Sequence, residues 1–423
     1  MTAMQVASLV LLLPAFGVAM WRDINVGLVT MPLALVVAAA AGIAPEEVVK
    51  HFPGGIVLLI IGVMYLFAHA RESGAIDLVV GWAVRLCGRR IWLMPWTMFL
   101  LSAVISGVGT LPSATVAITL PLALRMARTH GIPVTLMAVI ALAGGGAGGF
   151  SPVAPWTKIV DEAVAGAGIA YSPWALFALV TGLQLVLAVV AFLAFGGLRL
   201  LRSDSERRAA EREVGQVVRG AAPMSTYQLC SLLGLGVFVV SAFAFDVDVA
   251  TVGLVLGALL HAVFRPDGKR VVSGLPWNVI LLTTGVLLYV GVLDDLGTLD
   301  RIAAGLEHVS SQVLAVLAVL FLGTIFATFE SSTVAVLSIT APVAVAAIPA
   351  GASGAVMTGI VAALCVSVSS VAVSPFHLGG ALAVANSEEA EQSRVLRMLL
   401  LWSLGAALVV PLATLLVPLA AGL

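Results

Sequence analysis

The side chains that could do chemistry gather in four short stretches of an otherwise apolar sequence. These stretches are Gly109-Thr110, residues 151–158, residues 330–333 and residues 374–377. Two of them place Ser-Pro, at Ser151-Pro152 and Ser374-Pro375, in the middle of a long apolar run. Proline lacks a backbone donor and clashes with the preceding turn, so an interior Ser-Pro opens a helix. In hydrocarbon, opened backbone is tolerated only where protein buries it or where it lines a wet cavity. Two breaks at matching positions of two halves therefore predict a transporter binding site.

The two breaks would create helix N-termini near the middle of the membrane, with Pro155 at the start of one half-helix. Free N–H groups and the positive end of the helix dipole favour an anion there. Hydroxyl and carbonyl oxygens can instead bind a small hard cation such as sodium, so the pattern suits a cation-coupled anion carrier. The predicted substrate contacts are Thr110, Ser151, Pro152, Lys158, Ser332, Thr333, Ser374, Pro375 and His377. The predicted cation contacts are Gly109, Thr110, Ser151, Ser331, Thr333 and Ser374.

Three ionisable residues near these stretches have more than one interpretation. Lys158 either faces a substrate carboxylate, pairs with Asp161 three residues further on, or snorkels outward. His377 is a carboxylate contact, a protonatable group or a packed side chain. Glu330 is a proton carrier, a cation ligand or a solvated charge at the outer interface. For the glycine run at residues 144–149, helix packing is the first interpretation and close approach to a ligand is the second.

The composition indicates a membrane protein. Of 423 residues, 61% are hydrophobic and 10% are charged, against about 25% charged in soluble domains. Many apolar runs approach the roughly 20 residues that a helix needs to cross a bilayer, which predicts an all-α polytopic fold. No basic or aromatic stripe indicates nucleic acid, and the three cysteines have neither metal spacing nor an even count. We expect no cofactor beyond a coupling ion, Na⁺ or H⁺. The first run, residues 4–20, is interpreted as a retained helix.

The sequence is an internal duplication. Pro53 and Pro276 are 223 positions apart, and the same offset relates Gly62 to Gly285 and Thr110 to Thr333. So many matches at one offset, without a gap, indicate two repeats. We therefore divide the chain into a first membrane repeat (residues 1–201), a cytoplasmic linker (202–225) and a second membrane repeat (226–423).

The apolar runs predict the elements of each repeat. In the first repeat they are residues 4–21, 25–42, 54–70, an amphipathic 71–90, 92–106, 111–126, a broken 133–165 and 174–200. In the second they are residues 227–245, 250–264, 277–293, an amphipathic 294–309, 313–329, 331–348, a broken 355–386 and 396–420. Each repeat then has about five crossings, a re-entrant hairpin and a helix broken at Ser-Pro.

The basic residues favour inverted repeats. Five crossings are an odd number, so the second repeat enters the membrane from the opposite face to the first. With the arginine-rich linker in the cytoplasm, only Lys50 and Arg301 fall outside, apart from the buried Lys158. Both termini are then expected on the outer face.

At these residues the sequence resembles the divalent anion–sodium symporter family and its ion transporter superfamily. Residues 130–155 look most like bacterial malonate and C4-dicarboxylate carriers. Ser331-Ser332-Thr333 resembles the family's second Ser-Asn-Thr hairpin tip, with serine in place of asparagine, and both Ser-Pro loops match. The first tip reads Gly107-Val108-Gly109-Thr110, so only Thr110 carries over. The resemblance implies a homodimer in the bacterial inner membrane whose transport domains move as an elevator, with residues 71–90 and 294–309 as linking arms.

The sequence therefore predicts a secondary transporter of small carboxylate anions, such as the dicarboxylates malonate or succinate, driven by a sodium or proton gradient. A carrier of another small anion (an oxyanion, a sulfonate or a metalloid) remains open. A channel is a further alternative. An intramembrane serine hydrolase would use Ser151 or Ser374 with His377, but no nucleophile motif surrounds either serine.

Overall fold

The computed structural model describes residues 2–22, 24–86, 90–165, 171–203, 224–244, 248–298, 301, 311–330, 332–348 and 351–423. Within these ranges every regular element is a helix. Five helical stretches in the described part of the chain are long and apolar enough to cross a membrane: Gly54–Glu72, Pro173–Ala194, Trp277–Asp295, Gln312–Phe329 and Glu389–Ala420. Further apolar helices are shorter. The prediction of an all-α polytopic membrane protein is confirmed.

The helices of the first half follow the predicted order. They are α1 (Ala3–Arg22), α2 (Val26–Ala40), α3 (Pro45–Lys50), α4 (Gly54–Glu72), α5 (Ala75–Leu86), the short η1 (Ile91–Leu93), α6 (Met94–Gly107), α7 (Pro112–His130), α8 (Val134–Gly148), α9 (Pro155–Ala165), α10 (Pro173–Ala194) and α11 (Gly197–Ser203). The predicted helix break at Ser151-Pro152 lies between α8 and α9. Pro155 opens α9 at a position where its missing N–H would have no helical partner.

The second half repeats this order. Its helices are α13 (Thr226–Ala244), α14 (Val249–Phe264), α15 (Gly268–Ser273), α16 (Trp277–Asp295), α18 (Gln312–Phe329), α19 (Thr333–Ala346), α20 (Gly354–Ser370), α21 (Leu378–Ala385), α22 (Glu389–Thr414) and α23 (Leu416–Ala420). The break at Ser374-Pro375 separates α20 from α21. Most of the predicted linker, residues 204–223, and most of the predicted amphipathic stretch 294–309 lie outside the described residues.

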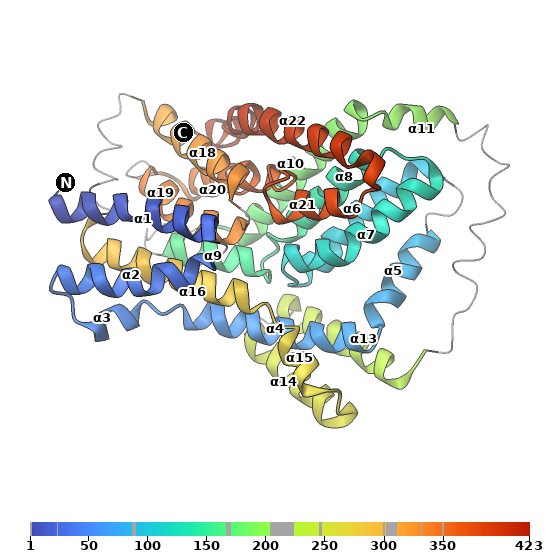
Figure 1. Cartoon of the computed structure of the whole chain (residues 1–423), viewed down its shortest axis with the longest axis horizontal. Helices are drawn as coiled ribbons and strands as arrows, with labels where there is room; N and C mark the ends of the chain where they lie inside the picture. Colours follow the sequence, from blue (N-terminus) through green and yellow to red (C-terminus); the bar gives the residue numbers. More distant parts are fainter. Residues whose placement is uncertain are drawn as a thin grey trace.

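The helices form two groups (Figure 1). We call α1–α4 with α13–α16 the scaffold bundle, in which α4 packs on α14 and α2 packs on α16. We call α6–α10 with α18–α22 the core bundle, in which α8 contacts α6 and α10, and α20 contacts α18 and α22. All residues of α8, and those of α20 from Val356 onward, are buried. Helices that are apolar all round belong at such a centre, and both lead directly into the Ser-Pro loops.

The scaffold bundle shows how closely the two repeats correspond. A Cβ added to Gly62 of α4 would overlap the carbonyl oxygen of Ala250 in α14. A Cβ added to Gly285 of α16 would overlap the carbonyl oxygen of Gly27 in α2. Gly62 and Gly285 are 223 positions apart, as are Gly27 and Ala250. The same backbone contact is therefore made twice, with the two repeats exchanging roles, and small residues allow this close approach.

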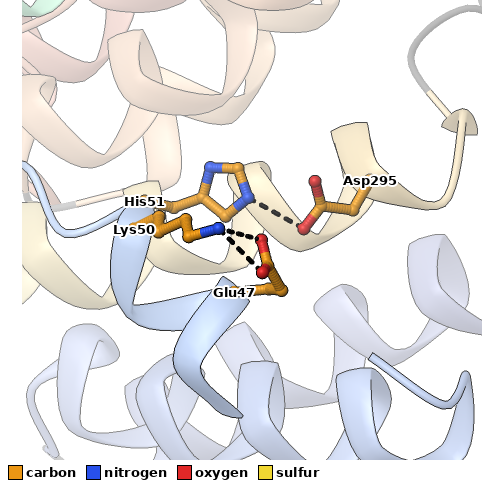
Figure 2. Close-up of polar contacts among 4 residues, drawn as sticks. All are labelled: Glu47, Lys50, His51 and Asp295. Atoms are coloured by element: carbon orange, nitrogen blue, oxygen red, sulfur yellow. Dashed lines mark hydrogen bonds and ion pairs between the residues drawn. The ribbon is translucent and has the colours of Figure 1, made fainter. Parts of the chain in front are cut away.

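Ion pairs occur at the ends of equivalent helices in the two repeats. His51, after α3, lies 2.8 Å from Asp295 at the end of α16, beside the Lys50–Glu47 pair at 2.7 Å (Figure 2). In the other repeat, Arg270 of α15 lies 3.5 Å from Glu72 at the end of α4. Partly exposed pairs of this kind contribute about 1 kcal/mol or less, so they orient the short helices and add little to stability.

Candidate functional site

A cavity of about 580 Å³ lies between the two bundles. The core bundle lines it with Ser113 of α7, Trp156 of α9 and Thr333 of α19, and the scaffold bundle with Asn25 and Asn278. A volume of this size is within the usual range of small-molecule sites, about 300–1,000 Å³. The wall is largely apolar with a few polar groups, which is typical of a site that orients a small ligand.

Helix N-termini converge on the cavity. First-turn residues of six helices line it, from α2, α7, α9, α16, α19 and α21: Val26, Pro112, Trp156, Val279, Thr333 and Gly379. No lysine or arginine is among the lining residues that the structure describes. The N–H groups and dipoles of these helix starts favour an anion, and Glu330 is the one acidic residue in the described lining.

The two Ser-Pro loops are fixed by the same kind of hydrogen bond. We call the contact between the loop after α8 and the end of α6 the first joint. There the Ser151 hydroxyl donates to the Gly107 carbonyl oxygen at 2.6 Å, and Thr157 donates to the Ser151 carbonyl at 2.7 Å. We call the contact between the loop after α20 and the end of α18 the second joint. There the Ser374 hydroxyl donates to the Thr328 carbonyl oxygen at 2.7 Å.

The second joint also contains a histidine with both ring nitrogens engaged. The Gly379 N–H donates to His377 Nδ1 at 3.3 Å, and His377 Nε2 lies 3.0 Å from Thr333 Oγ1. An Nδ1 that accepts carries no proton, so the neutral ring is protonated at Nε2 and donates to Thr333. The hydroxyl hydrogen of Thr333 is then available to the cavity, as a donor suited to a carboxylate.

The first joint has no such pair. Ala154 occupies the position equivalent to His377, at the common offset of 223. Thr110, the equivalent of Thr333, is buried, and its hydroxyl oxygen has no hydrogen-bond partner among the described residues. It follows Gly109, whose φ of 107° is a backbone conformation that suits glycine. A buried hydroxyl without a partner costs about 1–3 kcal/mol, so a ligand that contacts the Thr110 oxygen would offset this cost.

The predicted site residues divide into two sets. Glu330, Ser332, Thr333 and His377 line the cavity. Six others do not line it: Gly109, Thr110, Ser151, Pro152, Ser374 and Pro375. Ser331 lies outside the described residues. Glu330 is only 2% exposed, which does not fit a solvated charge.

The structure also bears on Lys158 as a substrate contact and on the serine–histidine pairs of a hydrolase. Lys158 also lies off the cavity wall, and its amino group is 3.0 Å from Asp161, which is the pair left open as an alternative. Neither predicted hydrolase pair is formed, because Ser151 and Ser374 donate to backbone carbonyls and His377 contacts Thr333.

Sequence reasoning missed several cavity residues. Asn25 caps α2, and its Nδ2 donates to the Asn278 carbonyl at 2.7 Å, so it joins two scaffold helices at the cavity. Ser113, Trp156 and Ser369 also line the wall. The cap at Asn25 was a readable signal, whereas a serine within an apolar helix carries no signal of the side it faces.

The fold and the cavity define a polytopic membrane carrier with an anion-favouring site between two bundles. Residues 16–372 match the model of the CitMHS family, described as citrate transporter. The chain therefore belongs to the citrate transporter family, a group of secondary transporters of small anions. The resemblance to the divalent anion–sodium symporter family and its superfamily is confirmed.

The fold also resembles a solved transporter structure. The crystal structure of the Alcanivorax borkumensis YdaH transporter, described as having an unusual topology, is 17% identical in sequence and matches with a TM-score of 0.55. The match covers 87% of this chain and 86% of that one. At this identity the likeness concerns the fold. A search of curated protein sequences returned no match.

Proposed function

We propose that this protein carries small carboxylates across the membrane, coupled to a sodium or proton gradient. The substrates are dicarboxylates such as malonate and succinate, or the tricarboxylate after which the family is named. The observation that carries the proposal is the convergence of six helix N-termini on a cavity whose described lining has no lysine or arginine. Such a wall stabilises negative charge through N–H groups and dipoles.

The substrate would bind mainly against the second joint. Ser332, Thr333 and His377 line the cavity there, and the tautomer of His377 leaves the Thr333 hydroxyl as a donor. The positive end of the helix dipole at the start of α19 also favours a bound anion. Ser374 and Pro375 serve indirectly in this arrangement, by holding the loop that carries His377.

The coupling cation has two candidate sites. Sodium would bind in the first joint, at the Thr110 hydroxyl and the neighbouring oxygens of Gly109 and Ser151, because the Thr110 oxygen is buried without a described partner. A proton would instead be carried at the cavity by Glu330 or His377, both buried. These sites belong to different repeats, so the coupling ion is linked to one joint or the other.

Transport would proceed by movement of the core bundle against the scaffold bundle, with the cavity between them opening to each side in turn. We propose a homodimer in the bacterial inner membrane with both termini outside, in which α5 links the bundles of the first repeat. The small-residue crossings of α4 with α14 and α2 with α16 give the scaffold a closely packed frame.

The test is uptake of radiolabelled citrate, malonate and succinate into proteoliposomes, with inward sodium and proton gradients imposed separately. We expect at least one of the three acids to accumulate above its external concentration under one gradient and not under the other. Equilibration that no gradient can drive uphill would indicate a channel. Failure to take up any of the three acids under either gradient would contradict the carboxylate proposal.

A further inference from the structure

The inner wall of the cavity contains one serine whose hydrogen-bonding role is fixed by its neighbours. Ser369, in α20, lines the cavity and is 7% exposed. It lies 223 positions after Gly146 of α8, which lines the same wall. A Cβ on Gly146 would lie 3.7 Å from that of Ser369. The two equivalent positions of the repeats therefore meet at the cavity, and only one of them has a side chain.

Two contacts determine where the hydroxyl hydrogen of Ser369 points. Its Oγ lies 2.6 Å from the carbonyl oxygen of Cys365, which can only accept, so the hydroxyl donates there. The side-chain amide of Gln184 lies 2.8 Å from the same Oγ. Because the serine hydrogen is already engaged, the amide must present its NH₂ group and donate. The orientation of the Gln184 amide follows from this network.

Gln184 is well suited to hold this arrangement. It is 1% exposed and lies within α10, a 22-residue apolar helix. The equivalent position in the second repeat is Ala407, so the contact exists once in the molecule. A polar side chain buried in a membrane helix is costly without a partner and marks a functional position.

We propose that Ser369, positioned by Gln184, accepts a hydrogen bond from an alcohol hydroxyl of the substrate and makes the carrier selective for hydroxycarboxylates. This inference rests on the proposed carboxylate transport. The serine oxygen donates once and accepts once within the protein, which leaves one lone pair for the cavity. There the serine oxygen can accept a hydrogen bond from a hydroxyl group, whereas it repels a carboxylate oxygen. Carboxylates are directed instead to Thr333 and the helix N-termini.

The wild-type protein tests this with matched substrate pairs. Citrate and tricarballylate differ by one hydroxyl, as do malate and succinate. We expect the hydroxylated acid of each pair to have roughly ten-fold higher uptake efficiency, the effect of one hydrogen bond of about 1.4 kcal/mol. Equal efficiencies within both pairs would overturn the inference while leaving carboxylate transport intact. No uptake of any of the four acids, nor of malonate, would overturn both.

Three variants identify the residues responsible. Ser369→Ala should bring both ratios to about one. Gln184→Met should lower them by less, since Ser369 still donates to the Cys365 carbonyl but loses the amide that holds its oxygen in place. Ser370→Ala is the control, because Ser370 is on the same helix and donates to the Ser367 carbonyl at 2.9 Å but does not line the cavity. An unchanged ratio in Ser369→Ala would refute the role of Ser369. A ratio is insensitive to the amount of folded protein, so reduced expression does not imitate the effect.

Discussion

The two joints share their architecture and differ in their chemistry. In both, the serine of a Ser-Pro loop donates to a carbonyl near the end of a helix, at 2.6 Å to α6 in the first joint and at 2.7 Å to α18 in the second. In the second joint, Thr333 is hydrogen-bonded to His377. In the first joint, the equivalent residues are Thr110 and Ala154, and alanine cannot make this bond. The same loop-fixing hydrogen bond therefore occurs twice, and we propose that the difference beside it assigns the cation to the first joint and the substrate to the second.

The neighbourhood of each joint agrees with this division. Glu330, Ser332, Thr333 and His377 of the second joint line the cavity, while Thr110 of the first joint is buried away from it. A group that contacts the cavity can select a substrate. A buried oxygen beyond the wall is better suited to a small ion. Repeat symmetry thus locates the two joints, and the departures from symmetry at Ala154 and His377 are the basis of the ligand that we propose for each.

The largest expected effect is on the packing that builds the first joint. Gly148→Ala would bring a Cβ against the carbonyl oxygen of Ala103 in α6, the helix whose end accepts the Ser151 hydrogen bond. We expect a loss of stability of about 1–3 kcal/mol from overpacking and little remaining transport. Thermal unfolding in detergent measures the first and proteoliposome uptake the second.

Gly145→Ala is the matched control for that variant. It lies on the same helix, and its added Cβ would make an ordinary contact of 3.5 Å with Val116. We expect near wild-type stability and uptake. Equal loss in both variants would mean that α8 as a whole, rather than its contact with α6, is sensitive to substitution.

The second prediction concerns the histidine that distinguishes the second joint. His377→Asn retains a side chain that can cap α21 but cannot span to Thr333. We expect a 10- to 100-fold loss of transport efficiency, the effect of a substrate hydrogen bond of about 1–3 kcal/mol that an unpositioned Thr333 hydroxyl no longer donates. The retained cap limits the change in unfolding temperature. His377→Ala should lose the cap as well and unfold at lower temperature. Wild-type uptake by His377→Asn would show that the Thr333 contact has no part in transport.

The smallest effect is expected at Lys158, whose pair with Asp161 lies off the cavity wall. Lys158→Met should change the substrate concentration for half-maximal uptake less than two-fold and reduce stability by about 1 kcal/mol or less. The double variant with Asp161→Leu should recover that stability. A ten-fold weaker substrate affinity in Lys158→Met would instead indicate that the amino group reaches the substrate during transport.

The fold was largely readable from the sequence because the signals were both strong and repeated. Apolar runs gave the helices, and the offset of 223 applied to Gly62 and Gly285 as well as to the Ser-Pro pairs. The breaks at Ser151-Pro152 and Ser374-Pro375 follow from the chemistry of proline. Helix ends differ from the predictions by a few residues, because capping and packing decide them together.

The site was only partly readable because sequence gives residue types but not the side of a helix that a residue faces. Lys158 was predicted to contact the substrate because a lysine in a membrane helix is costly, but Asp161, one helical turn away, pairs with it. Ser369 carries no motif, and its role depends on Gln184, which is 185 residues distant. Asn25 and Asn278 meet only because α2 crosses α16. These contacts arise from tertiary packing alone.

The most direct test of the division between the joints compares Thr110→Val with Thr333→Val in proteoliposomes. For each variant, substrate and cation are titrated separately. We expect Thr333→Val to raise the substrate concentration for half-maximal uptake about ten-fold and to leave the cation requirement unchanged. We expect Thr110→Val to raise the cation concentration needed for half-maximal uptake and to change the substrate concentration little. Both variants shifting the same parameter, or Thr110→Val shifting neither, would contradict this division.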